Sequence, residues 1–155
     1  MAPRGTRAVR VPPRWFIRLA WVVHRGLYRI TGGRFGLRRP RAGRWGMLRL
    51  TTIGRRSGEP RTVILAYLED GANLFTLAMN GWGEAEPAWW LNLQANPDAR
   101  VVLPGGPRPV RGRAAEGAER DRLWRLWREI DTNLDDFAAL RSRPTAVVVL
   151  ERRPG

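Results

Sequence analysis

The segment 54–61, GRRSGEPR, combines residue types that are suited to binding an anion. Gly54 and Gly58 permit backbone conformations in which successive N–H groups point into one concavity. Three guanidinium groups can bind phosphate or carboxylate through paired hydrogen bonds, and the Ser57 hydroxyl is a further donor. These guanidinium groups belong to Arg55, Arg56 and Arg61. The Gly-Lys-Ser/Thr order of a nucleotide P-loop is missing. By composition alone, an anion-binding loop and a charged surface hairpin are equally good interpretations.

Few other residues could form a metal or nucleophilic site. The chain has no cysteine, which excludes disulfides, thiolate metal sites and cysteine nucleophiles. The single histidine, His24, cannot form a histidine metal cluster, and no dense acidic cluster is present, so no metal site is expected. Glu84 and Glu86, and Asp135 and Asp136, could act as paired carboxylates. No acid–base partner lies near them in the sequence, so we expect them on the solvated surface.

Positive charge is concentrated in the first part of the chain. Residues 1–58 hold fifteen arginines and no acidic residue, whereas the remainder holds thirteen arginines and fourteen acidic residues. Lysine is absent, and this compositional bias weakens any argument from the number of arginines. Their uneven distribution remains. It predicts an anionic partner for this part of the chain: a membrane surface, a nucleic acid or a polyanionic ligand.

The N-terminal region predicts an arm followed by an amphipathic helix. Residues 1–13 are rich in proline and arginine and predict a flexible basic arm. Residues 14–30 place arginines on one side of a helical wheel and apolar residues on the other. The longest apolar run, 19–23, is far shorter than the roughly 20 residues of a membrane span. The helix could lie on an anionic membrane surface or pack on its own domain.

The rest of the chain predicts a small barrel or an α+β sheet. Apolar alternation and β-branched residues indicate six strands, at 47–53, 62–69, 73–79, 99–103, 108–115 and 145–151. Asp70-Gly71 predicts a tight hairpin between two of them. Two further helices are expected, at 88–96 and 118–130. Short antiparallel connections and few helices favour this architecture. A chain of 155 residues most simply forms one domain, here expected over residues 14–155.

Three motifs in this order resemble the deazaflavin-dependent nitroreductase family, which uses coenzyme F420. They are LTTIGRRSGEPR (50–61), YLEDGANLFTLAMNGWG (67–83) and PAWWLNLQANPDARV (87–101). The similarity covers roughly residues 15–151. It implies an α+β split β-barrel of the FMN-binding, flavin-reductase type, with about six mainly antiparallel strands and with helices packed outside. It also implies hydride transfer from the reduced coenzyme to a small apolar acceptor. FMN is the alternative cofactor.

The resemblance implies a set of coenzyme-binding residues. The coenzyme joins a flat apolar ring to a phosphodiester and a polyglutamate tail. In the family, the equivalents of the three arginines face the tail, the glycine-containing backbone holds the phosphate, and the next strand runs beside the ring. The implied residues are Gly54, Arg55, Arg56, Ser57, Gly58, Pro60, Arg61, Thr62, Val63, Ile64, Ala78, Met79, Asn80, Gly81, Trp89 and Asn92.

One stretch departs from the family pattern. Relatives that reduce quinones and nitro compounds carry several tyrosines after the second helix, but EIDTNLDDFAAL (129–140) has none. Leu134 and Phe137 occupy the matching places, so no proton donor or catalytic residue is assigned. Trp15, Trp21, Leu134 and Phe137 are the candidate walls of an acceptor pocket.

Three functions follow as hypotheses. The first is an F420H2-dependent oxidoreductase that acts on a quinone, enone or nitroaromatic compound. The second is a coenzyme carrier with little turnover, because the tyrosines are missing. The third, a nucleic-acid-binding protein, rests on the basic first 58 residues, yet no nucleic-acid motif is present. The enzyme is expected in the cytoplasm, and residues 14–30 could attach it to the inner face of the membrane. The resemblance to the family also implies that the chain could form a homodimer.

Overall fold

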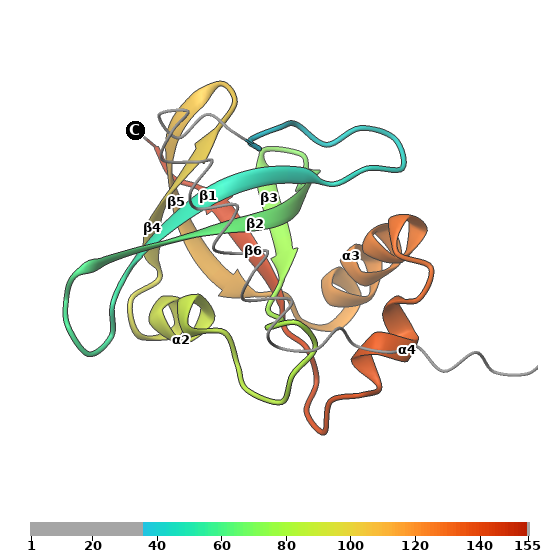
Figure 1. The fold of residues 1–155 in the computed structure, drawn as a ribbon. Coiled ribbons are helices and arrows are strands. Elements are labelled where there is room, and N and C mark those ends of the chain that lie inside the picture. Colours follow the sequence, from blue (N-terminus) through green and yellow to red (C-terminus); the bar gives the residue numbers. More distant parts are fainter. Residues whose placement is uncertain (1–35, 155) are drawn as a thin grey trace, which may run out of the picture.

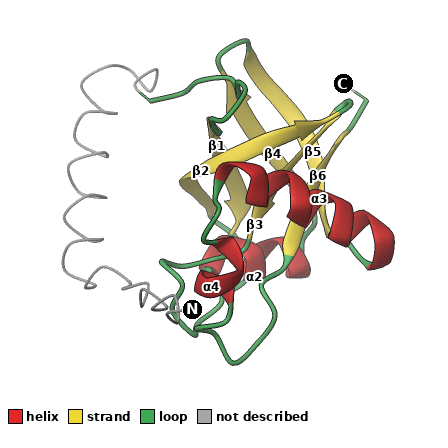
Figure 2. Ribbon diagram, turned by 90° about the vertical axis from the view of Figure 1, so that its right-hand side faces the viewer, coloured by secondary structure: helices red, strands yellow, loops and turns green. Residues whose placement is uncertain are grey.

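The computed structural model describes residues 36–154, which form six strands and three helices (Figures 1 and 2). The predicted arm at 1–13 and the predicted helix at 14–30 lie outside these residues. The strands are β1 (Gly46–Ile53), β2 (Pro60–Asp70), β3 (Asn73–Leu77), β4 (Asp98–Leu103), β5 (Gly106–Ala114) and β6 (Val147–Arg152). The helices are α2 (Ala88–Ala95), α3 (Gly117–Ile130) and α4 (Leu134–Ala138). No helix of the described part is long and apolar enough to span a membrane.

The six strands close into one antiparallel barrel in the order β1-β2-β3-β6-β5-β4. The longest pairing joins β1 to β2, from Gly46 opposite Tyr67 to Ile53 opposite Pro60. The tight turn predicted at Asp70-Gly71 joins β2 to β3, and Gly71 has the positive φ of 60° that such a turn requires. The predicted split barrel with helices outside is therefore confirmed.

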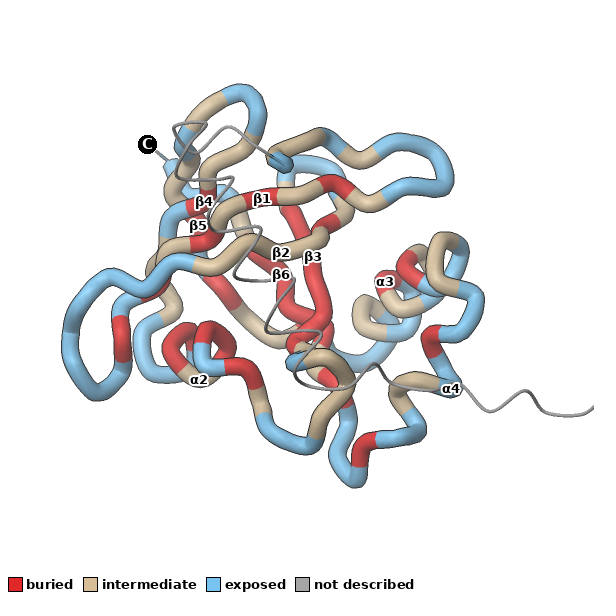
Figure 3. The backbone as a smooth tube through the Cα atoms, in the orientation of Figure 1, coloured by how far each residue is buried: buried red, intermediate tan, exposed pale blue. Residues whose placement is uncertain are grey.

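Two apolar clusters lie on opposite faces of the sheet, and β3 and β6 contribute to both. Most of β3 and β6 is accordingly buried (Figure 3). On β6, Val148 and Leu150 belong to the cluster that includes α2, whereas Val147 and Val149 face α3 and α4. Both faces of these strands are buried, which explains why VVVL reads as an uninterrupted apolar run. β1 instead alternates buried and half-buried residues, as expected for a strand with one buried face.

The boundaries differ from the predicted ones in a few places. Pro60 and Arg61 open β2 and do not belong to the preceding loop; proline is accepted as the first residue of a strand. β3 ends at Leu77, so the segment 78–79 starts the following connection. α4 was not predicted, because five residues are too few for a helical period to be recognised.

Candidate functional site

A cleft of about 530 Å³ lies between the β1–β2 loop and α2. Figure 1 shows this loop and α2 at the left and lower side of the barrel. The loop, the first half of β2, both ends of the β3–α2 connection and α2 all contribute to it. The lining residues are Gly54, Arg55, Arg56, Ser57, Arg61, Thr62, Val63, Leu65, Met79, Asn80, Pro87, Ala88, Trp89 and Asn92.

The β1–β2 loop is a tight turn closed by two backbone hydrogen bonds. The Gly54 N–H donates to Glu59 O at 2.8 Å, and the Gly58 N–H donates to Gly54 O at 2.8 Å. Gly58 has φ 70°, a conformation that glycine adopts without strain. A Cβ atom at Gly54 would lie 2.6 Å from Ser57 Oγ and 3.2 Å from Glu59 O, so either the Ser57 side chain or the loop backbone would have to shift. Both glycines are therefore required by this loop geometry.

The three arginines of the first motif all reach the same cleft. Arg61 Nη2 lies 3.4 Å from Ser57 Oγ, and Arg55 Nη1 lies 3.3 Å from Asn92 Oδ1. Arg56 is exposed at the tip of the loop. Within residues 36–154, none of the three is ion-paired with a carboxylate. Their positive charges are thus available to an anion in the cleft.

Asn92 connects α2 to the loop. Its side chain is 3% exposed, and Nδ2 donates to Thr52 Oγ1 at 3.1 Å. Oδ1 accepts from the backbone N–H of Arg55 at 3.1 Å. Because both ends of the amide are engaged, Asn92 holds the start of the loop against the helix.

The other end of the cleft is apolar. Val63 and Leu65 come from alternate positions of β2, so they share one face of the strand. Met79, Pro87 and Trp89 close this end, and Trp89 is 7% exposed, with its ring packed edge-on against Trp90 at 6.5 Å. The cleft is therefore basic at the loop and apolar between β2 and α2.

Eleven of the sixteen residues predicted to bind the coenzyme line this cleft. The other five are neighbours of lining residues in the chain but do not line it: Gly58, Pro60, Ile64, Ala78 and Gly81. Three lining residues were missed: Leu65, Pro87 and Ala88. The two-residue period of β2 could have indicated Leu65, since Val63 was predicted.

The candidate walls of the acceptor pocket do not line this cleft. Leu134 is fully buried against β3, β6 and α3. Phe137 stacks on Trp82, with ring centroids 5.8 Å apart and planes 6° apart. Trp15 and Trp21 lie outside the described residues.

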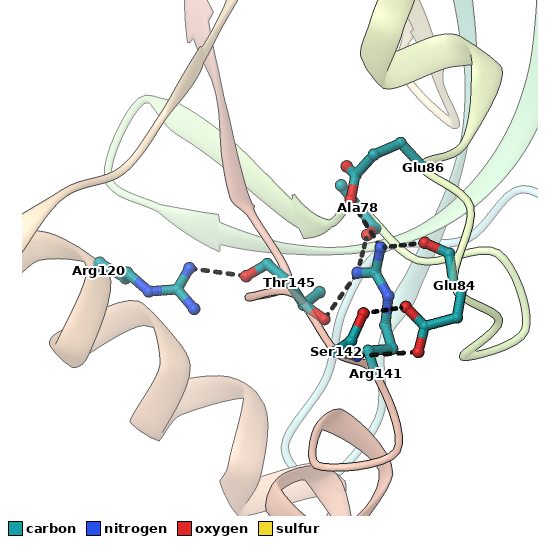
Figure 4. A network of polar contacts seen from close by, with 7 residues as sticks. All are labelled: Ala78, Glu84, Glu86, Arg120, Arg141, Ser142 and Thr145. Atoms are coloured by element: carbon teal, nitrogen blue, oxygen red, sulfur yellow. Dashed lines mark hydrogen bonds and ion pairs between the residues drawn. The ribbon is translucent and has the colours of Figure 1, made fainter.

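The candidate carboxylate pairs serve structural contacts. Glu86 pairs with Arg141 at 2.6 Å and its side chain is only 15% exposed, so the prediction of a solvated surface was wrong for this residue. Hydrogen bonds from Ser142 hold the pKa of the Glu84 carboxyl below its usual value (Figure 4). Asp135 accepts from Trp124 Nε1 and Arg128 Nη1, both at 2.8 Å, and these bonds lower its pKa. Asp136 is exposed, as predicted.

Comparison with known proteins supports one family. The F420H(2)-dependent quinone reductase family matches residues 21–152. A quinone reductase of this kind from Mycobacterium tuberculosis (strain ATCC 25618 / H37Rv) is 36% identical over 136 residues, which cover 84% of this chain and 89% of the relative.

Solved structures agree with this result. A protein described as a domain-swapped dimer has a TM-score of 0.65 and 27% identity, over 86% of this chain and 99% of its own. An F420-H2 dependent reductase (FDR-A) has a TM-score of 0.61 and 28% identity, over 68% of this chain and 93% of its own. Together with the six-stranded barrel, the matches show that this chain belongs to the F420H(2)-dependent quinone reductase family.

Proposed function

We propose that the chain is an F420H2-dependent oxidoreductase that reduces a quinone at the cleft between the β1–β2 loop and α2. The observation that carries this proposal is the division of the cleft into a basic end and an apolar end. Coenzyme F420 has the same division, because an anionic tail is attached to an apolar ring. The arginines at the loop match the tail, and the side chains between β2 and α2 match the ring.

The residues at the basic end fit an anionic group. Three guanidinium groups without carboxylate partners in the described structure, together with the Ser57 hydroxyl, are donors for phosphate and carboxylate oxygens. Gly54 is buried and leaves no room for a side chain, which keeps the loop closely folded beside these donors. When bound, the reduced coenzyme supplies the two electrons for the reaction.

The chain itself contributes binding, orientation and exclusion of water. Arg56 and Arg61 bind the tail, and Asn92 fixes the loop that carries Arg55. Val63, Leu65 and Trp89 form an apolar surface that shields the reacting ring from solvent. None of these roles requires a titrating side chain, which agrees with the absence of tyrosine from residues 129–140.

The acceptor is inferred from the relatives, which are named quinone reductases. An enone or nitroaromatic acceptor is the wider possibility given by the nitroreductase resemblance. A carrier with little turnover is the competing function, and it also predicts tight coenzyme binding. Steady-state oxidation of F420H2 with a soluble quinone such as menadione separates the two: the enzyme turns over many equivalents, whereas the carrier does not.

Binding is tested by fluorescence titration with oxidised F420. The double variant Arg56→Ala/Arg61→Ala should raise the Kd about 100-fold, roughly 1.4 kcal/mol for each arginine. Arg125→Ala is the control, because Arg125 is exposed on α3, away from the cleft. FMN should not compete with F420 at equal concentration. Wild-type protein that fails to bind F420 at micromolar concentrations would exclude the proposed function.

Two further properties belong to this proposal. A homodimer is expected, and it is supported by the similar structure described as a domain-swapped dimer. Sedimentation velocity measures the oligomeric state.

Residues 14–30 are proposed to bind an anionic membrane surface on the cytoplasmic side. Retention on vesicles containing phosphatidylglycerol, but not on DNA, at about 0.15 M salt would support this attachment.

A further inference from the structure

The connection 78–87 between β3 and α2 forms one wall of the cleft without regular secondary structure. It contributes Met79, Asn80 and Pro87 to the lining. Only one hydrogen bond closes within it, from the Gly83 N–H to Asn80 O at 3.0 Å. The position of this wall must therefore be determined by contacts with other parts of the chain.

One such contact is a backbone hydrogen bond, from the Ala78 N–H to Ala146 O at 2.9 Å. Most of the side-chain contacts come from Arg141, which lies between α4 and β6 (Figure 4). Its Nη2 contacts Glu86 Oε1 at 2.6 Å and Glu84 O at 3.4 Å. Its Nη1 donates to Ala78 O at 3.3 Å and to Thr145 Oγ1 at 2.9 Å. One guanidinium group thus reaches the beginning and the end of the connection, and joins both to the start of β6.

The guanidinium group is fully buried, with a side-chain exposure of 0%. A buried charge is unfavourable unless it is paired and its hydrogen bonds are made, and Glu86 supplies the opposite charge here. Thr145 is held in turn, because Arg120 Nη1 on α3 donates to Thr145 O at 2.8 Å (Figure 4). The planar fork of arginine suits several partners in fixed directions, which the single ammonium of lysine does not.

Two neighbouring contacts hold the middle of the connection. Ser142 binds both carboxylate oxygens of Glu84, through its N–H at 2.9 Å and its hydroxyl at 2.6 Å. Trp82, with φ 60°, is held by its stack on Phe137 of α4. The segment 137–145 therefore contacts the connection at its beginning, middle and end.

We propose that Arg141 is a positioning residue for the acceptor: by fixing the connection 78–87, it sets the shape of the apolar end of the cleft. This rests on the proposed function. In the proposed function the tail lies at the basic end and the ring between β2 and α2, so an acceptor that contacts the ring lies beside it at the apolar end. Met79 and Pro87, which border that end, flank the points where Arg141 holds the chain.

The proposal separates two properties of the enzyme. Within residues 36–154, the loop 54–59 and Asn92 make no hydrogen bond or ion pair with Arg141, so binding of the coenzyme tail should persist when Arg141 is changed. The salt dependence of coenzyme binding reports this end of the cleft. The KM for the quinone reports the other end.

The experiment compares Arg141→Lys with Arg143→Lys, in the full chain. Arg143 lies two residues further on, is exposed and makes no ion pair within the described structure, so the control carries the same chemical change. Glu86→Gln is a second variant that keeps an oxygen acceptor for Arg141 and removes only the charge. The measurements are amide hydrogen exchange without coenzyme, the Kd of oxidised F420 at two salt concentrations, and steady-state kinetics with menadione.

In Arg141→Lys, exchange at the Gly83 and Ser142 amides should accelerate at least tenfold, and the KM for menadione should rise about tenfold. The kcat at saturating quinone and the salt dependence of the coenzyme Kd should stay within about twofold of wild type. Glu86→Gln should give a smaller change in the same direction. Arg143→Lys should match wild type throughout.

Two failures are distinguishable. Wild-type protein that does not bind F420 contradicts the proposed function and, with it, any role in acceptor binding. Wild-type protein that turns over menadione, with Arg141→Lys indistinguishable from Arg143→Lys in KM and in hydrogen exchange, contradicts the role of Arg141 alone. A coenzyme Kd that rises as much as the KM would also contradict it, because the effect would then extend to the whole cleft.

Discussion

The buried amide of Asn92 is hydrogen-bonded to the backbone N–H of Arg55, 37 residues earlier in the chain. The same amide donates to Thr52, whose side chain is fully buried in β1. A single residue of α2 thus connects β1 with the second residue of the β1–β2 loop. This contact makes the position of the loop depend on the helix that forms the opposite wall of the cleft.

Asn92→Ala should weaken both stability and coenzyme binding. It leaves the Thr52 hydroxyl and the Arg55 N–H without their partner, so the free energy of unfolding should fall by about 1–3 kcal/mol. The Kd of F420 should rise about tenfold as the loop loses its support. Urea denaturation and fluorescence titration measure the two effects. Gln94→Ala, at an exposed position of the same helix, should change neither.

Gly54→Ala tests whether the closely folded loop is needed for binding. The new Cβ would lie 2.6 Å from Ser57 Oγ and 3.2 Å from Glu59 O, so the Ser57 side chain or the loop backbone must shift. We expect a destabilisation of about 1–3 kcal/mol and clearly weaker binding of F420, measured by titration.

The double variant Gly54→Ala/Ser57→Ala provides the control for that clash. It removes the nearest contact and keeps the contact with Glu59 O, so it should recover part of the stability and part of the affinity relative to Gly54→Ala. Ser57→Ala alone shows the separate contribution of the hydroxyl. Unchanged affinity in Gly54→Ala would mean that the coenzyme does not depend on this loop conformation.

At position 82, glycine should give a more stable protein than alanine, which is the reverse of the usual order. It is the one non-glycine residue within 36–154 with a positive φ, and it follows Gly81, which has φ 56°. Both variants lose the stack on Phe137. Only alanine keeps a Cβ atom, which is strained at a positive φ, whereas glycine adopts this conformation freely. Trp82→Gly should therefore be more stable than Trp82→Ala by about 1 kcal/mol. Thermal unfolding of the two variants gives the answer, and the opposite ranking would show that the turn is relaxed.

Much of the fold could be predicted because its signals are local. Alternation in β1, the apolar run of β6 and the Asp70-Gly71 turn each depend on adjacent residues, and together they indicate a six-stranded antiparallel barrel. The residues of the cleft came from motifs that the family shares. Most of them line one cleft because β1, β2 and α2 bring the motifs together.

What could not be predicted depends on contacts between distant residues. Arg141 meets Ala78 and Glu86 across 63 and 55 residues, and nothing in the local sequence distinguishes it from the exposed Arg143. For the same reason, the ion pair of Glu86 with Arg141 was not predicted, and Glu86 was expected on the solvated surface. The positive φ of Trp82 was not predicted, because tryptophan rarely adopts this conformation and its stack on Phe137 involves a residue far along the chain.

Asp70 should make the stability of the barrel dependent on acidic pH. It accepts from Arg122 Nη1 at 2.8 Å and Nη2 at 3.0 Å, which ties the β2–β3 hairpin to α3. These hydrogen bonds hold the pKa of the Asp70 carboxyl below its ordinary value of 3.8. The pKa of Asp70 is lower in the folded state than in the unfolded state. Its contribution to the free energy of unfolding is therefore fully present above about pH 5, and it is lost as the pH falls below 3.8 through the folded pKa.

Asp70→Asn should remove this part of the pH dependence and keep the turn, because Asn-Gly suits a tight hairpin as well as Asp-Gly does. Urea denaturation between pH 5 and pH 2 should therefore show a smaller loss of stability in Asp70→Asn than in wild type. Asp121→Asn is the matched control, since Asp121 is exposed on α3 and makes no ion pair within the described residues. Its pH dependence should follow that of wild type. If Asp70→Asn also followed wild type, the ion pair with Arg122 would contribute nothing to folding in solution.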